Sequence, residues 1–146
     1  MTDDETLFIT RVREKFFGGM HPVPKILAMC LFLAIKDRVQ TLSFVLRKPE
    51  PGGLIPIGMY VLADNRFLVP PPQHLARHLG ACLKEFSQHS PLTDYLLHFR
   101  QELSDREERW EVTFNCSRSV METMELLEKA WDDAYPDMCA IADKMR

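Results

Sequence analysis

The run from Ile26 to Ile35 constrains the fold of this 146-residue chain more than any other segment. It belongs to a predicted helix over residues 24–38 that is apolar on nearly every side and, apart from Lys25, charged only in its last turn. Such a helix must be buried on most sides or covered by a partner. The run is too short to cross a bilayer, which needs about 20 apolar residues. We therefore expect this helix at the centre of a packed domain or at an interface.

Helical spacing of apolar residues predicts further helices around this one. The first covers Asp3–Phe17 and begins with three acidic residues, which the helix dipole favours at that end. Gly18 and Gly19 are expected to close it in the left-handed conformation that glycine accepts. The remaining helices are predicted over residues 73–88, over residues 93–103, from the N-cap Ser119 through Trp131, and from Pro136 as a separate short helix.

Four segments have the composition or the alternation of strands: residues 41–46, 54–63, 66–69 and 110–116. Asp64 and Asn65 tolerate positive φ, so they predict a tight hairpin between the second and third strands. The fold class that follows is α+β, a small and mainly antiparallel sheet with helices packed on it in a single domain. Along the chain we distinguish an N-terminal helix (1–20), a core (23–90) and additional helices with one strand (91–146).

Composition removes several classes of function. A net charge of −3 and the lack of a polybasic run argue against a nucleic-acid partner. The apolar run is too short for membrane insertion, and the acidic N-terminus differs from the positively charged start of a secretory signal. We expect a cytoplasmic location.

No pattern in the chain predicts catalysis. The phosphate-binding motif Gly-x-x-x-x-Gly-Lys-Ser/Thr is absent. The four cysteines lie far apart, three of them among apolar residues, and are interpreted as reduced core thiols. His74 and His78 stand four apart on a predicted helix and are the candidate pair for a metal, but no third ligand stands out. We expect no enzymatic activity, no cofactor and no bound metal.

Residues 23–27, 34–38 and 41–45 together resemble the N-terminal, non-catalytic domain of the ATPases of type II secretion and type IV pilus assembly. In that family an apolar helix with an Ala-Ile-x-x-Arg-type end leads into a strand. Residues 57–64 are similar to its next strand, and residues 70–75 with Leu83-Lys84 are similar to its proline-led helix. The resemblance covers about residues 23–87.

The differences from that family affect its chemistry. Thr41-Leu42-Ser43-Phe44 replaces the Ser-Asp-Ile-His signature, and Val61 stands where the family has an arginine that approaches nucleotide. The ATPase domain is missing. The resemblance therefore implies an adaptor domain without nucleotide chemistry.

The resulting hypothesis is a non-catalytic interaction module, linked to a secretion or pilus-like apparatus, that binds a protein partner or forms a homo-oligomer. Methionine-rich and aromatic helix faces suit adaptable interfaces, and they supply the interaction candidates Met29, Phe32, Met121, Met124, Trp131 and Met138. The alternatives are a sensor domain that binds a small ligand and a metal-dependent enzyme built on His74 and His78.

Overall fold

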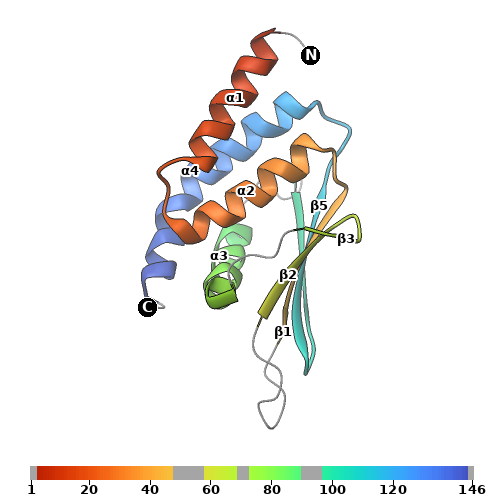
Figure 1. The fold of residues 1–146 in the computed structure, drawn as a ribbon, viewed down its shortest axis with the longest axis vertical. Helices are drawn as coiled ribbons and strands as arrows, with labels where there is room; N and C mark the ends of the chain where they lie inside the picture. The colour runs from red at the N-terminus through yellow and green to blue at the C-terminus, as the bar shows by residue number, and fades with distance from the viewer. Residues whose placement is uncertain (1–2, 48–57, 69–72, 90–96, 145–146) are drawn as a thin grey trace.

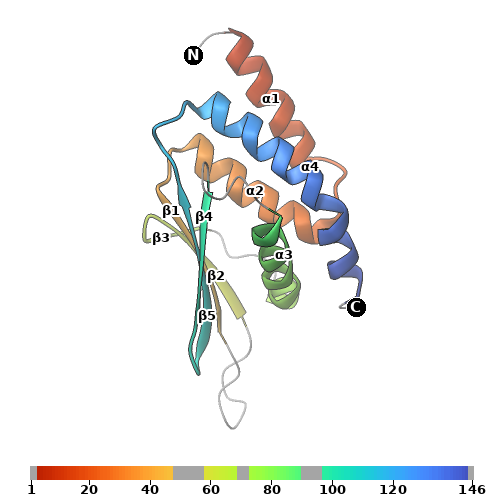
Figure 2. The ribbon, with the colours of Figure 1, turned by 180° about the vertical axis from the view of Figure 1, so that it is seen from behind.

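The computed structural model describes residues 3–47, 58–68, 73–89 and 97–144. Helices form one layer and a five-stranded sheet forms the other, so that one face of the sheet is covered by helices (Figure 1). The opposite face carries no described element, as the reverse view also shows (Figure 2). The predicted α+β fold with a mainly antiparallel sheet is confirmed. Its elements are α1 (Asp3–Phe17), α2 (Pro22–Lys36), β1 (Thr41–Arg47), β2 (Gly58–Ala63), β3 (Arg66–Phe67), the 3-10 turn η1 (Gln73–Leu75), α3 (Ala76–Gln88), β4 (Leu97–Leu103), β5 (Glu107–Phe114) and α4 (Val120–Lys144).

The ends of α1 and α2 differ from prediction in detail. Gly18 does not take the left-handed conformation expected of it; instead, a Cβ there would lie 2.7 Å from the carbonyl oxygen of Glu14. Position 18 therefore requires glycine, because there is no room for a side chain. The side chain of His21 caps α2 by accepting a hydrogen bond from the amide of Val23, so the helix begins earlier than predicted. The left-handed residue after α2 is Arg38, with φ of 58°.

The sheet has the strand order β3-β2-β1-β5-β4, and every described pair of strands is antiparallel. Asp64 and Asn65 have φ values of 49° and 67°, which confirms the predicted hairpin between β2 and β3. Strand β2 begins at Gly58; the rest of the predicted strand, residues 54–57, lies outside the described residues. Strand β3 is shorter than predicted, with two residues.

The prediction of a helix over residues 93–103 is wrong for its described part, because Leu97–Leu103 form strand β4. Leu97, Phe99 and Leu103 alternate with polar residues, which is the period of a strand, but the earlier leucines suggested helical spacing. Pairing with β5 along seven consecutive residues decides the outcome. A short turn joins β4 to β5. In it the amide of Ser104 donates to the carbonyl oxygen of Glu107, and the amide of Glu107 donates to Oγ of Ser104.

The predicted break at Pro136 is also wrong, because α4 runs without interruption from Val120 to Lys144. Buried positions continue through the proline at helical spacing: Leu127, Trp131, Ala134, Met138 and Ala142. Pro136 itself is exposed on the opposite side of the helix. Packing of one continuous apolar face therefore outweighs the hydrogen bond that a proline removes.

An aromatic chain crosses the interior and links the two layers. The ring centroids of Phe16 on α1 and Trp131 on α4 are 5.6 Å apart, and those of Trp131 and Phe86 on α3 are 5.4 Å apart. Phe86 in turn lies 5.6 Å from Phe99 on β4. Such contacts add to the large apolar area that each ring buries. The inner face of the sheet completes the core with Leu42, Phe44, Met59, Val61, Trp110, Val112 and Phe114.

Charged side chains hold α1 along α4. Both guanidinium nitrogens of Arg11 donate to the carboxylate of Glu128, at 2.9 and 2.8 Å. Lys15 donates to Glu128 at 3.1 Å and to Asp132 at 2.8 Å. The hydrogen bond from Arg11 is the main cause that lowers the pKa of Glu128 below its usual value of 4.5. Glu128 thus accepts hydrogen bonds from both basic side chains of α1 that contact α4.

Truncation of Phe16 tests the aromatic chain. Phe16→Ala removes a fully buried ring at its start, and substitutions of this kind cost about 3–5 kcal/mol of unfolding free energy. Urea unfolding followed by circular dichroism measures the loss. Phe17→Ala is the matched control, because its half-buried ring contacts Phe32 at the margin of the core and should cost clearly less. Equal losses in the two variants would contradict the central place of Phe16.

The pH dependence of stability tests the contact between α1 and α4. Because the folded pKa of Glu128 is lowered, this group adds stability above about pH 4.5 and loses it as the pH falls through the folded pKa. Glu128→Gln should therefore lower the urea midpoint near neutral pH and reduce its further fall on acidification. Glu125→Gln, at an exposed position on the same helix, should behave like the native chain. A native pH profile in Glu128→Gln would contradict this role.

Candidate functional site

Four of the six predicted interaction residues lie in the core of the chain and not on a surface. The side chains of Phe32, Met124, Trp131 and Met138 are fully or almost fully buried. They are enclosed because α2 and α4 pack against each other and against α1 and α3. The apolar side chains that suggested an interface pack against other helices of the same chain instead. Met29 and Met121 remain partly exposed.

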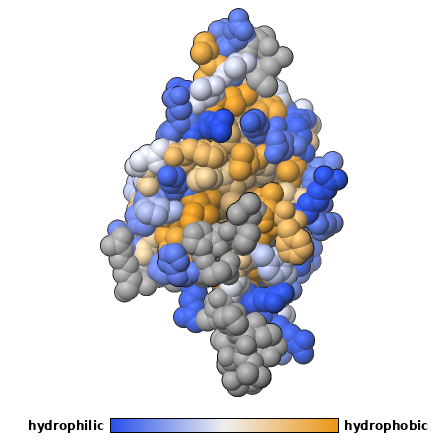
Figure 3. Space-filling model, viewed as in Figure 1, coloured by the Kyte–Doolittle hydropathy of each residue, from blue (hydrophilic) through white to orange (hydrophobic). Residues whose placement is uncertain are grey.

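One face of α2 is only partly covered, although three helices contact this helix. Its buried residues occupy one side, and the opposite side presents Ile26, Met29, Cys30 and Leu33 at helical spacing. We call these four residues the α2 stripe. Leu33 is exposed and the other three are half-buried. Hydrophobic residues gather over the middle of this side of the molecule, with hydrophilic residues around them (Figure 3).

The candidate metal pair His74 and His78 is not brought together with a third ligand among the described residues. His74 lies exposed in η1, while His78 is half-buried in α3, where its Nδ1 has no hydrogen-bond partner. The group of described side chains that could hold a metal is a different one: Glu85, His89 and Asp137.

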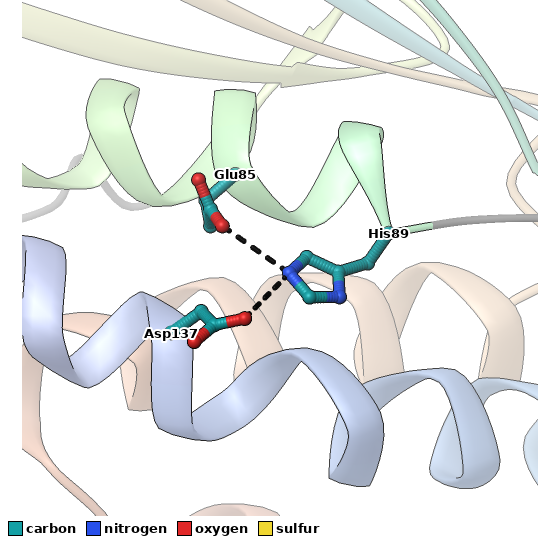
Figure 4. A group of neighbouring side chains, drawn as sticks. All are labelled: Glu85, His89 and Asp137. Atoms are coloured by element: carbon teal, nitrogen blue, oxygen red, sulfur yellow. Dashed lines mark hydrogen bonds and ion pairs between the residues drawn. The ribbon is translucent and has the colours of Figure 1, made fainter.

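These three side chains converge between the end of α3 and the second half of α4 (Figure 4). Nε2 of His89 lies 3.2 Å from Oε1 of Glu85 and 2.9 Å from Oδ2 of Asp137. Glu85 and His89 are each about one quarter exposed, and Asp137 is 58% exposed. A protonated imidazole can serve both carboxylates as an ion pair, and a divalent cation can be bound by the same three atoms.

The sequence contained half of the signal for this group. Glu85 and His89 are four residues apart, a spacing that places them on one helix face. Asp137 could not be assigned to them, because the break expected at Pro136 separated it from α4.

Cys82, which is buried, and Cys30, which is half-buried, are unsuited to nucleophilic catalysis. Burial raises the pKa of Cys82 to about 12 and that of Cys30 to about 11, so both are protonated thiols at neutral pH. The thiol of Cys82 lies 3.6 Å from the carbonyl oxygen of Met138 in the core. All four cysteines are free in the structure, but only Cys82 is buried, whereas Cys30, Cys116 and Cys139 are half-buried; the prediction of core positions holds for Cys82 alone, and that of reduced thiols stays a prediction.

The hollows on the described surface are open. One, of about 350 Å³, lies between the end of α3 and the outer strands of the sheet, and its lining includes Lys84, Ser87, Phe99, Gln101 and Trp110. Another, of about 330 Å³, lies at the β4–β5 turn. A small-ligand sensor requires a largely enclosed apolar pocket, so the sensor alternative gains no support from these hollows and stays a prediction.

Among the described residues, no helix is both long enough and apolar enough to span a membrane. In comparisons with models of known protein families, with curated proteins and with solved structures, the chain matches none of them. The resemblance to the secretion and pilus ATPases over residues 23–87 and the cytoplasmic location therefore stay predictions.

Proposed function

We propose that this chain is a non-catalytic interaction module that binds another protein through the α2 stripe. The observation that supports the proposal is that the residues between Lys25 and Lys36 on the outward side of α2, which are Ile26, Met29, Cys30 and Leu33, are all apolar. A helix exposed to water on one side normally carries polar residues there. An apolar strip with a charged border is typical of an interaction site.

The border of the stripe indicates the chemistry of the partner. Lys25 lies four residues before Met29, and Lys36 lies three residues after Leu33, so both lysines follow the same edge of the stripe. We propose that the occupant is the apolar face of a partner helix with acidic residues along the matching edge. The apolar contact supplies affinity, and the lysines select orientation and partner.

A secretion or pilus-like apparatus is the proposed setting. The α2 stripe lies inside the segment that resembles the adaptor domain of the secretion ATPases, and the chain lacks the motifs of nucleotide hydrolysis. An adaptor domain without these motifs would act through protein contacts, and the α2 stripe is a candidate surface for them.

Substitution within the stripe tests the proposal. A partner is first identified by cross-linking in the native cell, and its Kd is then measured with purified chains. Leu33→Asp should weaken binding at least tenfold, the change that about 1.4 kcal/mol represents, because it places a charge in the apolar contact. Leu7→Asp is the matched control, since Leu7 is 69% exposed on α1. A partner bound equally well by both variants would contradict the α2 stripe as the contact.

A second candidate function is binding of a divalent metal at Glu85, His89 and Asp137. It is favoured by one observation: both carboxylates approach the same imidazole nitrogen, which carries at most one proton. Carboxylate and imidazole together suit zinc or another transition metal. The site would join α3 to α4.

Zinc titration distinguishes this second candidate from an ion pair. Zinc should raise the melting temperature of the native chain, because a ligand that binds the folded state stabilises it. His89→Gln should abolish the rise. His74→Gln should keep it, since His74 is exposed and lies outside the group. An unchanged melting temperature of the native chain with zinc would leave the three residues as an ion pair.

A further inference from the structure

The two edges of the sheet differ in a way that bears on assembly. The edge formed by β3 has two residues, and so offers little backbone for pairing. The other edge, β4, has seven residues in unbroken register with β5 and contains neither proline nor lysine. Natural edge strands are usually protected by bulges, prolines, charged side chains (lysine above all) or shortness. Of these protections the described part of β4 has only the charged residues Arg100 and Glu102.

One hydrogen bond, together with the strand register, shows which backbone groups of β4 are directed away from the sheet. The amide of Ser104 donates to the carbonyl oxygen of Glu107, which fixes the alternation of bonded pairs along β4 and β5. Glu102, Arg100 and His98 therefore bond to β5. The amides and carbonyls of Phe99, Gln101 and Leu103 are directed outward, where the sheet order has no further strand.

From this edge we propose that two copies of the chain pair through β4. The strands run antiparallel, the twofold axis passes Gln101, and the two sheets become one of ten strands. In this register Phe99 is opposite Leu103 of the second copy, and the outward amides of each chain meet outward carbonyls of the other. The inference is independent of the α2 stripe, which lies on another element.

The charges on the uncovered face of the sheet select this register. Within one chain, Arg100 is opposite Glu111 and Glu102 is opposite Arg109, so positive and negative residues alternate across β5 and β4. With Gln101 on the axis, Arg100 meets Glu102 of the second copy, and the alternation continues across the interface. An axis at Arg100 would place Arg100 opposite Arg100 of the second copy, and an axis at Glu102 would place the two copies of Glu102 opposite each other. Like charges directly opposite each other are unfavourable.

The helical side of the edge has apolar surface and space for the second strand. Leu103 is 65% exposed, and pairing would place it beside Phe99 of the other copy. Phe99 and Gln101 line the open hollow of about 350 Å³ next to α3. The second copy's Leu103 would cover the apolar part of this hollow, which a single chain leaves open to water.

Cysteine scanning tests the pairing and its register together. Arg100→Cys, Gln101→Cys and Glu102→Cys are oxidised separately, beside the native chain as a control for its own four cysteines. A residue forms a disulfide with its own counterpart only near the twofold axis, because the two Cα atoms must lie about 4.4–6.8 Å apart. Gln101→Cys should give the cross-linked dimer fastest, with the 101–101 bond identified by mass spectrometry. Fastest cross-linking at position 100 or 102, or at none of the three, would overturn the proposed register.

Sedimentation equilibrium over a concentration series tests the edge without oxidation. The native chain should approach twice its own mass, and Gln101→Ala, which keeps the outward amide, should do the same. Gln101→Pro should remain monomeric while its circular dichroism stays native, because the removed amide is not used by β5. A monomeric native chain, or a dimer that withstands Gln101→Pro, would overturn the proposal; if this variant fails to fold, the cysteine scan decides. Leu33→Asp should leave the dimer intact, so failure here and failure of the α2 stripe are distinguishable.

Discussion

The contact of Trp131 with Phe16 and Phe86 is the interaction on which the rest of the structure depends. Through these rings α4 holds α1 on one side and α3 on the other, and Phe86 extends the contact to Phe99 on β4. Segments from both ends of the chain thus meet at one residue. The indole nitrogen of Trp131 has no hydrogen-bond partner, a cost that the packing of the ring offsets. Position and orientation of the whole helical layer follow from this contact.

This use of apolar residues limits what is left for binding. Most of the methionine and aromatic side chains that suggested an interface fill the space between α2 and α4, where a protein partner cannot reach them. The surfaces that remain are defined by what the helices fail to cover. One is the α2 stripe, on the side of α2 turned away from its three neighbours, and the other is the edge of β4. Within the described residues, no helix fully covers the stripe and no strand pairs with the outer edge of β4.

The sequence was sufficient where local signals and burial agree. Acidic residues at the start of α1, the apolar run of α2 and the Asp64-Asn65 turn predicted their elements, because each depends on neighbours in the chain. The sequence was insufficient where contacts between residues far apart in the chain determine the secondary structure. Strand β4 exists because β5 pairs with it, and α4 continues through Pro136 because its buried face is held by other helices. The group of Glu85, His89 and Asp137 depends on that second outcome, so only half of it could be predicted.

Pairing through β4 and binding through the α2 stripe would reinforce each other. The stripe belongs to the helical layer and β4 to the far edge of the sheet, so a dimer leaves both copies of the stripe uncovered (Figure 1). Two stripes on one rigid sheet can engage two sites of an oligomeric partner, and the second contact then forms at a high effective concentration. The stripe has one exposed and three half-buried side chains, so its apolar contact is small and the second contact would add to the affinity of the first.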